Sequence, residues 1–268
     1  AVSSPSICNG ETAEIVVYTS EVGVSYQLRL DIDNTTVGVP IAGNGGNISF
    51  SVGPVTSTTY NILATGGNSC SIELNNKSNV TVYPLPDPTL IVDDATICSG
   101  EIASIILNNS ENGVSYQLRK DVDNSPVGAV QVGTGGNLVF DINPIISTVY
   151  NIYATTSNAC SLELYDKAVV SVLPTPNLSL SLSDDEICYG ETATIVLSNS
   201  ELGVSYQLRL NVDNSLVGSL IMGTGFDIQF SVNPLASTVY NVLASNSNSC
   251  TGTLTDLSSV TVHSLPAK

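Results

Sequence analysis

Six cysteines are the residues of this chain with the clearest chemistry, because they recur at a fixed interval. Each of two series has a spacing of 90 residues: Cys8, Cys98 and Cys188, and Cys70, Cys160 and Cys250. Within one copy the two cysteines are 62 residues apart, unlike the short pairs of zinc sites. Their strict recurrence argues against free buried thiols. We therefore expect one disulfide in each copy: Cys8–Cys70, Cys98–Cys160 and Cys188–Cys250. Such bonds imply an oxidising or extracellular setting.

Recurrent acidic residues are the second group with candidate chemistry. Glu11, Glu21 and Asp33 could form paired carboxylates of the glycosidase type, which face one cleft about 5–10 Å apart. No pattern in the sequence predicts such a cleft. The chain has one histidine, His263. Most metal sites and most nucleophile–histidine pairs are therefore excluded. We therefore do not expect an enzyme.

Calcium is the one cofactor that the acidic residues suggest, because hard cations bind several oxygen ligands. The candidate ligands lie just after the joints or in acidic turns: Asp93, Asp94, Asp184 and Asp185, and Asp31, Asp33, Asp121 and Asp123. No complete calcium-binding loop is present. Solvated turn carboxylates are the alternative interpretation of the same residues.

A longer repeat surrounds the cysteines. The segment Gly-Val-Ser-Tyr-Gln-Leu-Arg occurs at Gly23–Arg29, Gly113–Arg119 and Gly203–Arg209, again with an offset of 90 residues. The three copies align without a gap, and such a period is an ordinary domain size. We predict three domains, residues 1–86, 87–176 and 177–268, whose function depends on repetition.

Alternating apolar and polar residues predict short β-strands in each copy. Thr12–Thr19 and Val24–Leu30 show this period of two, which marks strands with one buried face. Turn residues such as Gly43–Gly46 separate the segments, and no helical periodicity is present. About seven strands in each copy predict an all-β chain of three tandem immunoglobulin-like β-sandwiches. Tyr60 suits either a tyrosine corner or a plain core position.

The predicted disulfides conflict with the predicted strands. If every segment crosses the sandwich, Cys8 and Cys70 lie at opposite ends, and a disulfide needs its Cα atoms within about 7 Å. Either one segment, such as Val37–Ala42, does not cross, or Cys8 lies on the first strand. We keep the disulfide and question the number of strands.

Charge and joints restrict the partners and the shape. The net charge is −17, whereas nucleic acids and anionic membranes attract basic patches. No apolar run is long enough for membrane insertion. The joints Pro84–Pro88 and Pro174–Pro176 predict stiff connections, so we expect a monomeric, extended rod. The first residues contain no charged and then apolar segment, so we expect no signal peptide in this sequence, and we expect the chain to be a piece of a longer protein.

Several motifs together resemble a known family. These are Gly23–Arg29, Gly43–Gly46, Ser57–Asn61 with the preceding proline, and the Ala-Thr ahead of Cys70. They are similar to the Ig-like repeats of giant secreted surface proteins of Bacteroidota, including gliding-motility adhesins of the flavobacterial kind. The resemblance covers the whole chain, although Phe226 replaces a turn glycine in the third copy. It implies secretion, a cell-surface location and no catalytic residues.

Two functions are consistent with these patterns. The first is a stalk segment of an adhesin, which contacts neighbouring repeats of the same long chain and displays an adhesive region. The alternative is a module that binds an extracellular polysaccharide, a surface or a protein. Carbohydrate platforms expose aromatic residues, whereas this chain has no tryptophan and we expect Tyr26 and Tyr60 to be buried. The sequence therefore favours the stalk.

Overall fold

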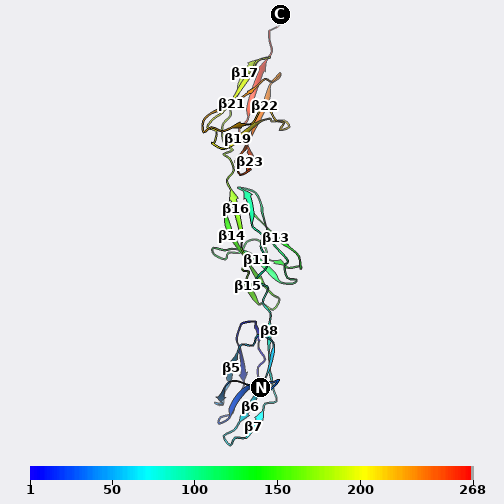
Figure 1. Cartoon of the computed structure of the whole chain (residues 1–268), viewed down its shortest axis with the longest axis vertical. Coiled ribbons are helices and arrows are strands. Elements are labelled where there is room, and N and C mark those ends of the chain that lie inside the picture. Colours follow the sequence, from blue (N-terminus) through cyan, green and yellow to red (C-terminus); the bar gives the residue numbers. More distant parts are fainter. Residues whose placement is uncertain (267–268) are drawn as a thin grey trace. The chain divides into compact units, whose positions relative to one another are not determined.

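The computed structural model describes residues 1–266, and the ribbon consists of β-strands without helices in that part of the chain (Figure 1). The strands of the first repeat are β1 (Ser6–Cys8), β2 (Ala13–Val17), β3 (Ser25–Leu30), β4 (Thr36–Ala42), β5 (Ile48–Val52), β6 (Thr58–Thr65), β7 (Ser71–Glu73) and β8 (Ser78–Tyr83). The prediction of an all-β fold is confirmed.

The second and third repeats follow the same order of strands. The second contains β9 (Ala95–Cys98), β10 (Ala103–Leu107), β11 (Ser115–Lys120), β12 (Gln131–Val132), β13 (Leu138–Ile142), β14 (Thr148–Thr155), β15 (Ser161–Glu163) and β16 (Ala168–Leu173). The third contains β17 (Asp185–Cys188), β18 (Ala193–Leu197), β19 (Ser205–Leu210), β20 (Ile221–Met222), β21 (Ile228–Val232), β22 (Thr238–Ser245), β23 (Thr251–Thr253) and β24 (Ser258–His263).

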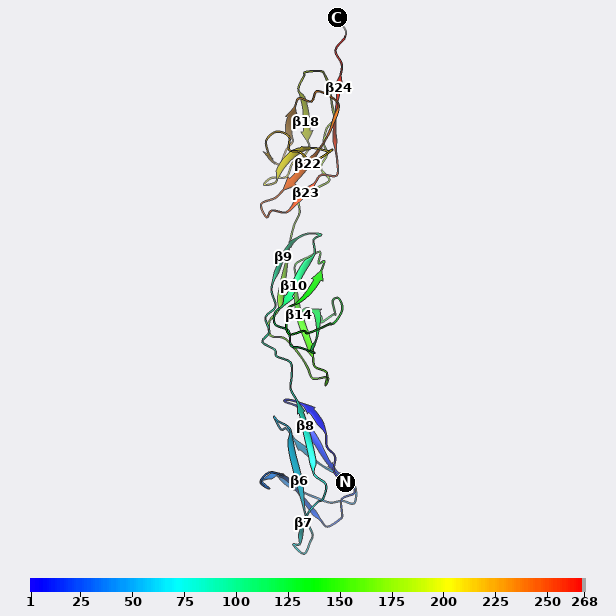
Figure 2. The same cartoon turned by 90° about the vertical axis from the view of Figure 1, so that its right-hand side faces the viewer.

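Each repeat is a sandwich of two sheets. In the first repeat the larger sheet has the order β1-β8-β6-β3-β4 with β7 paired to β6, and the smaller sheet pairs β2 with β5. Figure 2 shows β6 and β8 next to each other. The first strand runs parallel to the last one, with Cys8 opposite Tyr83. This pairing places the end of β1 beside the point where the chain leaves the repeat.

The core of each sandwich comes from the alternation that the sequence shows. In the first repeat Ile15, Leu28 and Ile62 are fully buried, whereas Glu14, beside Ile15 in β2, is exposed. Truncating such a side chain to alanine costs about 2–5 kcal/mol, because a cavity remains. The third repeat builds an equivalent core around Ile195, Leu208 and Val242.

The chain divides into two compact units, and the middle repeat contributes to both. The first contains residues 1–93, 105–140 and 149–168, and the second contains residues 94–104, 141–148 and 169–268. Each unit contains one junction between consecutive repeats. Each junction is therefore a local site with its own set of contacts.

Candidate functional site at the junctions between repeats

The disulfides join consecutive repeats. Cys8 bonds to Cys160 with a Cα–Cα distance of 5.5 Å, and Cys98 bonds to Cys250 at 5.6 Å. The predicted pairs Cys8–Cys70, Cys98–Cys160 and Cys188–Cys250 are therefore wrong. Cys70 and Cys188 are free thiols and are exposed.

The register of the sheet explains why a pair within one repeat cannot form. Cys8 lies opposite Tyr83 at the exit end of the sandwich, where β8 finishes. Cys70 follows the far end of β6, because Thr58 pairs with Val80 and β6 continues to Thr65. These positions are about ten residues apart along the sheet, or roughly 33 Å at about 3.3 Å per residue. A disulfide spans less than about 7 Å between Cα atoms.

Of the two solutions considered for the conflict between disulfides and strands, the placement of Cys8 on the first strand is correct, but it does not bring Cys8 near Cys70. Cys8 does lie on the first strand, but β1 is parallel to β8, so its last residue is at the exit end. Val37–Ala42 belongs to β4 at the edge of the larger sheet. The two cysteines of the second repeat therefore bond to different repeats: Cys160 bonds to the first repeat and Cys98 to the third.

A short turn fixes the exit-end cysteine. The backbone N–H of Cys8 donates to Glu11 Oε2 at 2.8 Å, and Asn9 N–H donates to the carbonyl of Tyr83 at 2.9 Å. The same carboxylate contact holds Cys98 through Glu101 at 2.9 Å. Gly10, at φ +90°, allows this turn, since such a conformation is strained for other residues. Glu11, considered above as a catalytic acid, therefore has a structural contact.

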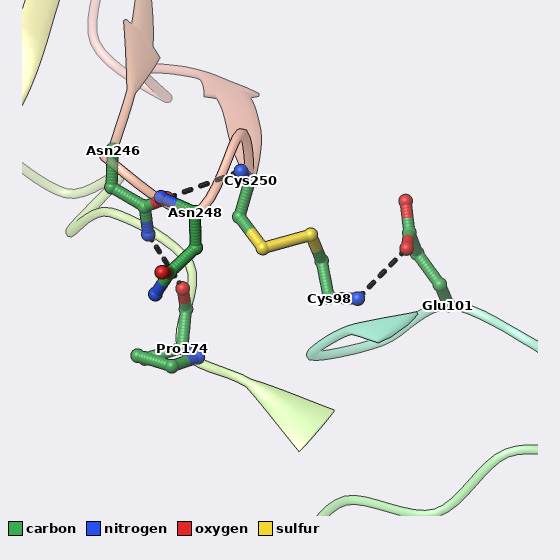
Figure 3. The surroundings of a disulfide bond; sticks show 6 residues. All are labelled: Cys98, Glu101, Pro174, Asn246, Asn248 and Cys250. Carbon is green, nitrogen blue, oxygen red and sulfur yellow. Dashed lines mark hydrogen bonds between the residues drawn. A yellow bond between two sulfur atoms is a disulfide. The ribbon is translucent and has the colours of Figure 1, made fainter. Parts of the chain in front are cut away.

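The opposite end of each sandwich, where the preceding joint enters, is called the entry end. A second turn, between the sixth and seventh strands of a repeat, holds the cysteine at this end. Figure 3 shows Cys250 in this turn and Cys98 across the disulfide. Asn246 Oδ1 accepts from the N–H of Cys250 at 3.1 Å, while Asn246 Nδ2 donates to the carbonyl of Pro174 in the joint at 2.7 Å. Asn246 therefore ties the cysteine turn to the connecting segment.

Joint 1, residues 84–92, is bound to the second repeat by hydrogen bonds beside the disulfide. Asp87 N–H donates to Glu111 Oε2 at 2.7 Å, and Tyr165 N–H donates to the carbonyl of Pro88 at 2.9 Å. Val92 N–H donates to Asp166 Oδ2 at 2.9 Å. The joint is thus fixed by backbone and carboxylate contacts in addition to its prolines.

Joint 2, residues 174–182, repeats these contacts in the second unit. Asn177 N–H donates to Glu201 Oε2 at 2.7 Å, and Leu182 N–H donates to Asp256 Oδ2 at 2.9 Å. Thr255 N–H donates to the carbonyl of Leu178 at 2.8 Å. The Leu178 side chain lies against Gly252, where a Cβ would come within 2.6 Å of it. At both junctions, a disulfide links the two repeats, and a glutamate and an aspartate of the following repeat accept hydrogen bonds from the joint.

The glutamates at the junctions make structural contacts, whereas the sequence suggested this position only as a candidate catalytic carboxylate. Glu111 and Glu201 are the counterparts of Glu21, which was considered as one of a catalytic pair. Their carboxylates accept joint N–H groups. Asp33 accepts from the N–H of Thr35 at 2.9 Å in a tight turn. This contact lowers the pKa of Asp33 below its ordinary value of 3.8.

The candidate calcium ligands do not converge. Among residues 1–266, no group of three or more acidic, histidine or cysteine side chains is placed to hold a metal ion. Protein donors contact the carboxylates after the joints: Asp93 accepts from Asn108, Asp94 from Val169, Asp184 from Ser259 and Asp185 from Thr194. Calcium binding remains a prediction, because these carboxylates contact protein donors and do not form a cluster of ligands in the part of the chain that the structure describes.

The remaining candidate ligands lie in a polar network on the larger sheet. Asp31 contacts Lys77 at 2.6 Å and accepts from Asn61, which also accepts from Arg29. The hydrogen bond from Lys77 lowers the pKa of Asp31, and the same contact raises the pKa of Lys77 above its ordinary value. Asp121 and Asp123 repeat the pattern of Asp31 and Asp33.

The tyrosine that bonds back to the backbone is Tyr26. Its hydroxyl accepts from the N–H of Glu21 at 2.8 Å, and Tyr116 and Tyr206 repeat the contact. Tyr60 is buried in the core, and its side-chain hydrogen bond is with Thr58. Burial raises the pKa of Tyr60. Of the two interpretations of Tyr60, the structure supports the core position.

No family model and no curated protein matches the chain. Among solved structures, the titin fragment I67–I69 is 15% identical, with a TM-score of 0.49 over 98% of this chain and 96% of that chain. A calcium-stabilised adhesin with which an Antarctic bacterium binds ice is 11% identical, with a TM-score of 0.44 over 98% and 72%. The three-domain ectodomain of mouse nectin-like molecule 4 is 12% identical, with a TM-score of 0.37 over 100% and 99%.

These neighbours are immunoglobulin-domain proteins and bacterial adhesins, and at such identity and TM-score they carry no argument about function. Within residues 1–266, no helix is both long and apolar enough to cross a membrane. The geometry of the junctions is therefore what bears on the function.

Proposed function

We propose that this chain is a structural stalk segment of a secreted cell-surface adhesin, in which each repeat is covalently fastened to the next. The observation that carries the proposal is the pairing of Cys8 with Cys160 and of Cys98 with Cys250 across the two joints. A disulfide within a repeat would stabilise that repeat alone. A disulfide between repeats restricts how neighbours move, which is what a stalk requires.

The chemistry of the junctions supports an extracellular location. Disulfides persist in oxidising compartments and are rare in the cytosol. The acidic surface and the net charge of −17 keep the chain soluble. Together with the resemblance to surface repeats, this supports display of an adhesive region by neighbouring parts of a longer protein, with gliding motility as one setting.

Two measurements on the intact chain test the proposal. Peptide mapping without reduction should recover Cys8–Cys160 and Cys98–Cys250 linked peptides. Binding to an array of extracellular polysaccharides should stay at the level of the unfolded, reduced control. Linked peptides from within single repeats would contradict the stalk. Saturable binding to one polysaccharide would instead support the alternative of a binding module.

A further inference from the structure

Two cysteines keep free thiols, and they belong to opposite series. In both disulfides, the exit-end cysteine of one repeat bonds the entry-end cysteine of the following repeat. Cys188 is the exit-end cysteine of the third repeat, and Cys70 is the entry-end cysteine of the first. By this rule, neither finds its partner among the three repeats. Their four counterparts are all bonded.

The entry end of the first repeat is uncovered where the other two are covered. Cys160 and Cys250 are fully buried, whereas Cys70 is exposed. Beside it, Ile72 has 69% of its surface exposed. Its neighbour Leu74 is only partly buried, although its counterparts Leu164 and Leu254 are buried. The Cys70 and Leu74 positions are thus buried in the two repeats that follow another repeat and its joint, and the counterparts of Ile72, Leu162 and Gly252, are half-buried.

A polar contact is open at the same end. Glu111 and Glu201 each accept a hydrogen bond from the joint that enters their repeat. The equivalent Glu21 is exposed, and in residues 1–266 no donor hydrogen-bonds its carboxylate. The entry end of the first repeat thus offers a thiol, an apolar position and an acceptor in the arrangement that two other repeats use.

The exit end of the third repeat is already in the bonded arrangement. Cys188 N–H donates to Glu191 Oε2 at 2.8 Å, as Cys8 and Cys98 do to their glutamates. Tyr189 N–H donates to the carbonyl of His263 at 2.9 Å, as Asn9 does to Tyr83. The turn that presents the sulfur therefore needs no rearrangement before it bonds.

We propose that Cys188 of one copy forms a head-to-tail disulfide with Cys70 of a second copy of this chain. This inference deepens and rests on the proposed function, since it extends the same linkage beyond three repeats. The partner must present an entry end of this type, with a cysteine turn beside an apolar residue and a glutamate. A second copy satisfies all three requirements.

The bond requires an oxidant, for which a small disulfide such as oxidised glutathione suffices. The Cys188 thiolate attacks one sulfur of glutathione disulfide, which forms a mixed disulfide and releases one glutathione thiolate. The Cys70 thiolate of the second copy then attacks the Cys188 sulfur and releases the second glutathione. The two cysteine protons end on the two glutathione thiols, so the pair of electrons and both protons are accounted for.

Two complementary variants of the full chain test the proposal. Cys70→Ser keeps only Cys188 free, and Cys188→Ser keeps only Cys70 free, so each is the control for the other. One variant is labelled with ¹⁵N, and the two are mixed at about 1 mM, near the effective concentration of a short tether. Glutathione disulfide is added at moderate salt, which screens the acidic charge. Mass spectrometry then counts mixed dimers and homodimers.

Chance pairing gives mixed dimers at about twice either homodimer, whereas a specific junction should give an excess of about tenfold. Peptide mapping of the mixed dimer should recover Cys188 linked to Cys70. Dimers in the chance ratio, or no dimers, would overturn the inference. The same digest reports Cys8–Cys160 and Cys98–Cys250. If these internal bonds are present while the mixed dimer is absent, the inference fails and the proposed function stands.

Discussion

A single glycine in each repeat allows the tyrosine–backbone contact to form. A Cβ at Gly133 would overlap the carbonyl oxygen of Glu111 and press on the ring of Tyr116. Gly43 and Gly223 have the same surroundings. Because the obstacle is backbone, it cannot move aside as the end of a flexible side chain would.

We therefore expect Gly133→Ala to lower the free energy of unfolding of the second repeat by about 1–3 kcal/mol. Its thermal unfolding midpoint should fall accordingly. Gly136→Ala is the matched control, because a Cβ there meets only Thr134 Oγ1 at 3.8 Å and the third repeat carries Phe226 at that position. Differential scanning calorimetry compares the two. Equal midpoints for both variants would show that the contact yields easily.

The ion pair between Asp121 and Lys167 should give the second repeat a pH-dependent stability. The contact lowers the pKa of Asp121 below 3.8 and raises the pKa of Lys167 above 10.5. Glu163 is the second carboxylate near the lysine, at 3.8 Å. The aspartate contributes above its unfolded pKa and loses its effect as the pH falls through the folded value. The lysine contributes below 10.5 and loses its effect as the pH rises through its folded pKa.

Lys167→Leu should accordingly lower the melting midpoint slightly at pH 7, and the difference should close near pH 2. Leucine is the natural residue at the equivalent Leu257, and it keeps most of the apolar stem. Melting curves of both proteins across this pH range measure the effect. A difference that persists at pH 2 would show that packing, and not charge, is responsible. The effect is small, because exposed ion pairs contribute little.

At the scale of the strands and joints, the structure predicts that a cut chain stays in one piece. Cys8–Cys160 bridges the two sides of joint 1. If a protease site is inserted between Leu85 and Pro86 and then cleaved, the fragments should migrate together until they are reduced. The Cys8→Ser variant is the control, and its fragments should separate without reductant. Separation of the unreduced original chain would contradict the inter-repeat bond.

The strands were largely predictable from sequence, because alternation such as Ala13–Val17 depends only on which face meets the core. The conflict between the ends of Cys8 and Cys70 was visible as well. Its solution was not, because the parallel pairing of β1 with β8 depends on contacts between residues far apart in sequence. The constant separation of 152 residues between bonded cysteines is also present in the sequence, but nothing local distinguishes it from the spacing of 62.

The roles of the acidic residues were harder to predict for a similar reason. Glu111 recurs with Glu21 and Glu201, and recurrence alone suits catalysis, metal binding or structure. Its contact is with Asp87, which lies in the joint and differs from the Asn177 that replaces it in the next junction. The donor is a backbone N–H in both cases. Because every residue except proline has a backbone N–H, the residue type at this position does not reveal the contact.

For the whole molecule, the disulfides should contribute far more stability than the free cysteines. Each closes a separation of 152 residues, which in the chain-entropy model stabilises by up to about 5 kcal/mol. Cys8→Ser should therefore lower the guanidinium midpoint, and Cys70→Ser should leave it unchanged. Fluorescence of the tyrosines or circular dichroism follows the transition. Equal loss in both variants would mean that Cys70 has a bond in solution.

The two bonds also change how far the chain can be drawn out under tension. Because Cys8 is fixed to Cys160 and Cys98 to Cys250, the shortest covalent route between the ends passes only through residues 1–8, 98–160 and 250–268. That route contains about a third of the residues, and an extended residue adds at most about 3.6 Å. It runs backwards through the middle repeat, from Cys160 to Cys98. A fully unfolded but oxidised chain would therefore stop extending at about a third of its contour length, with the load on this shortest route. Between folded repeats, the backbone and a disulfide both cross each joint.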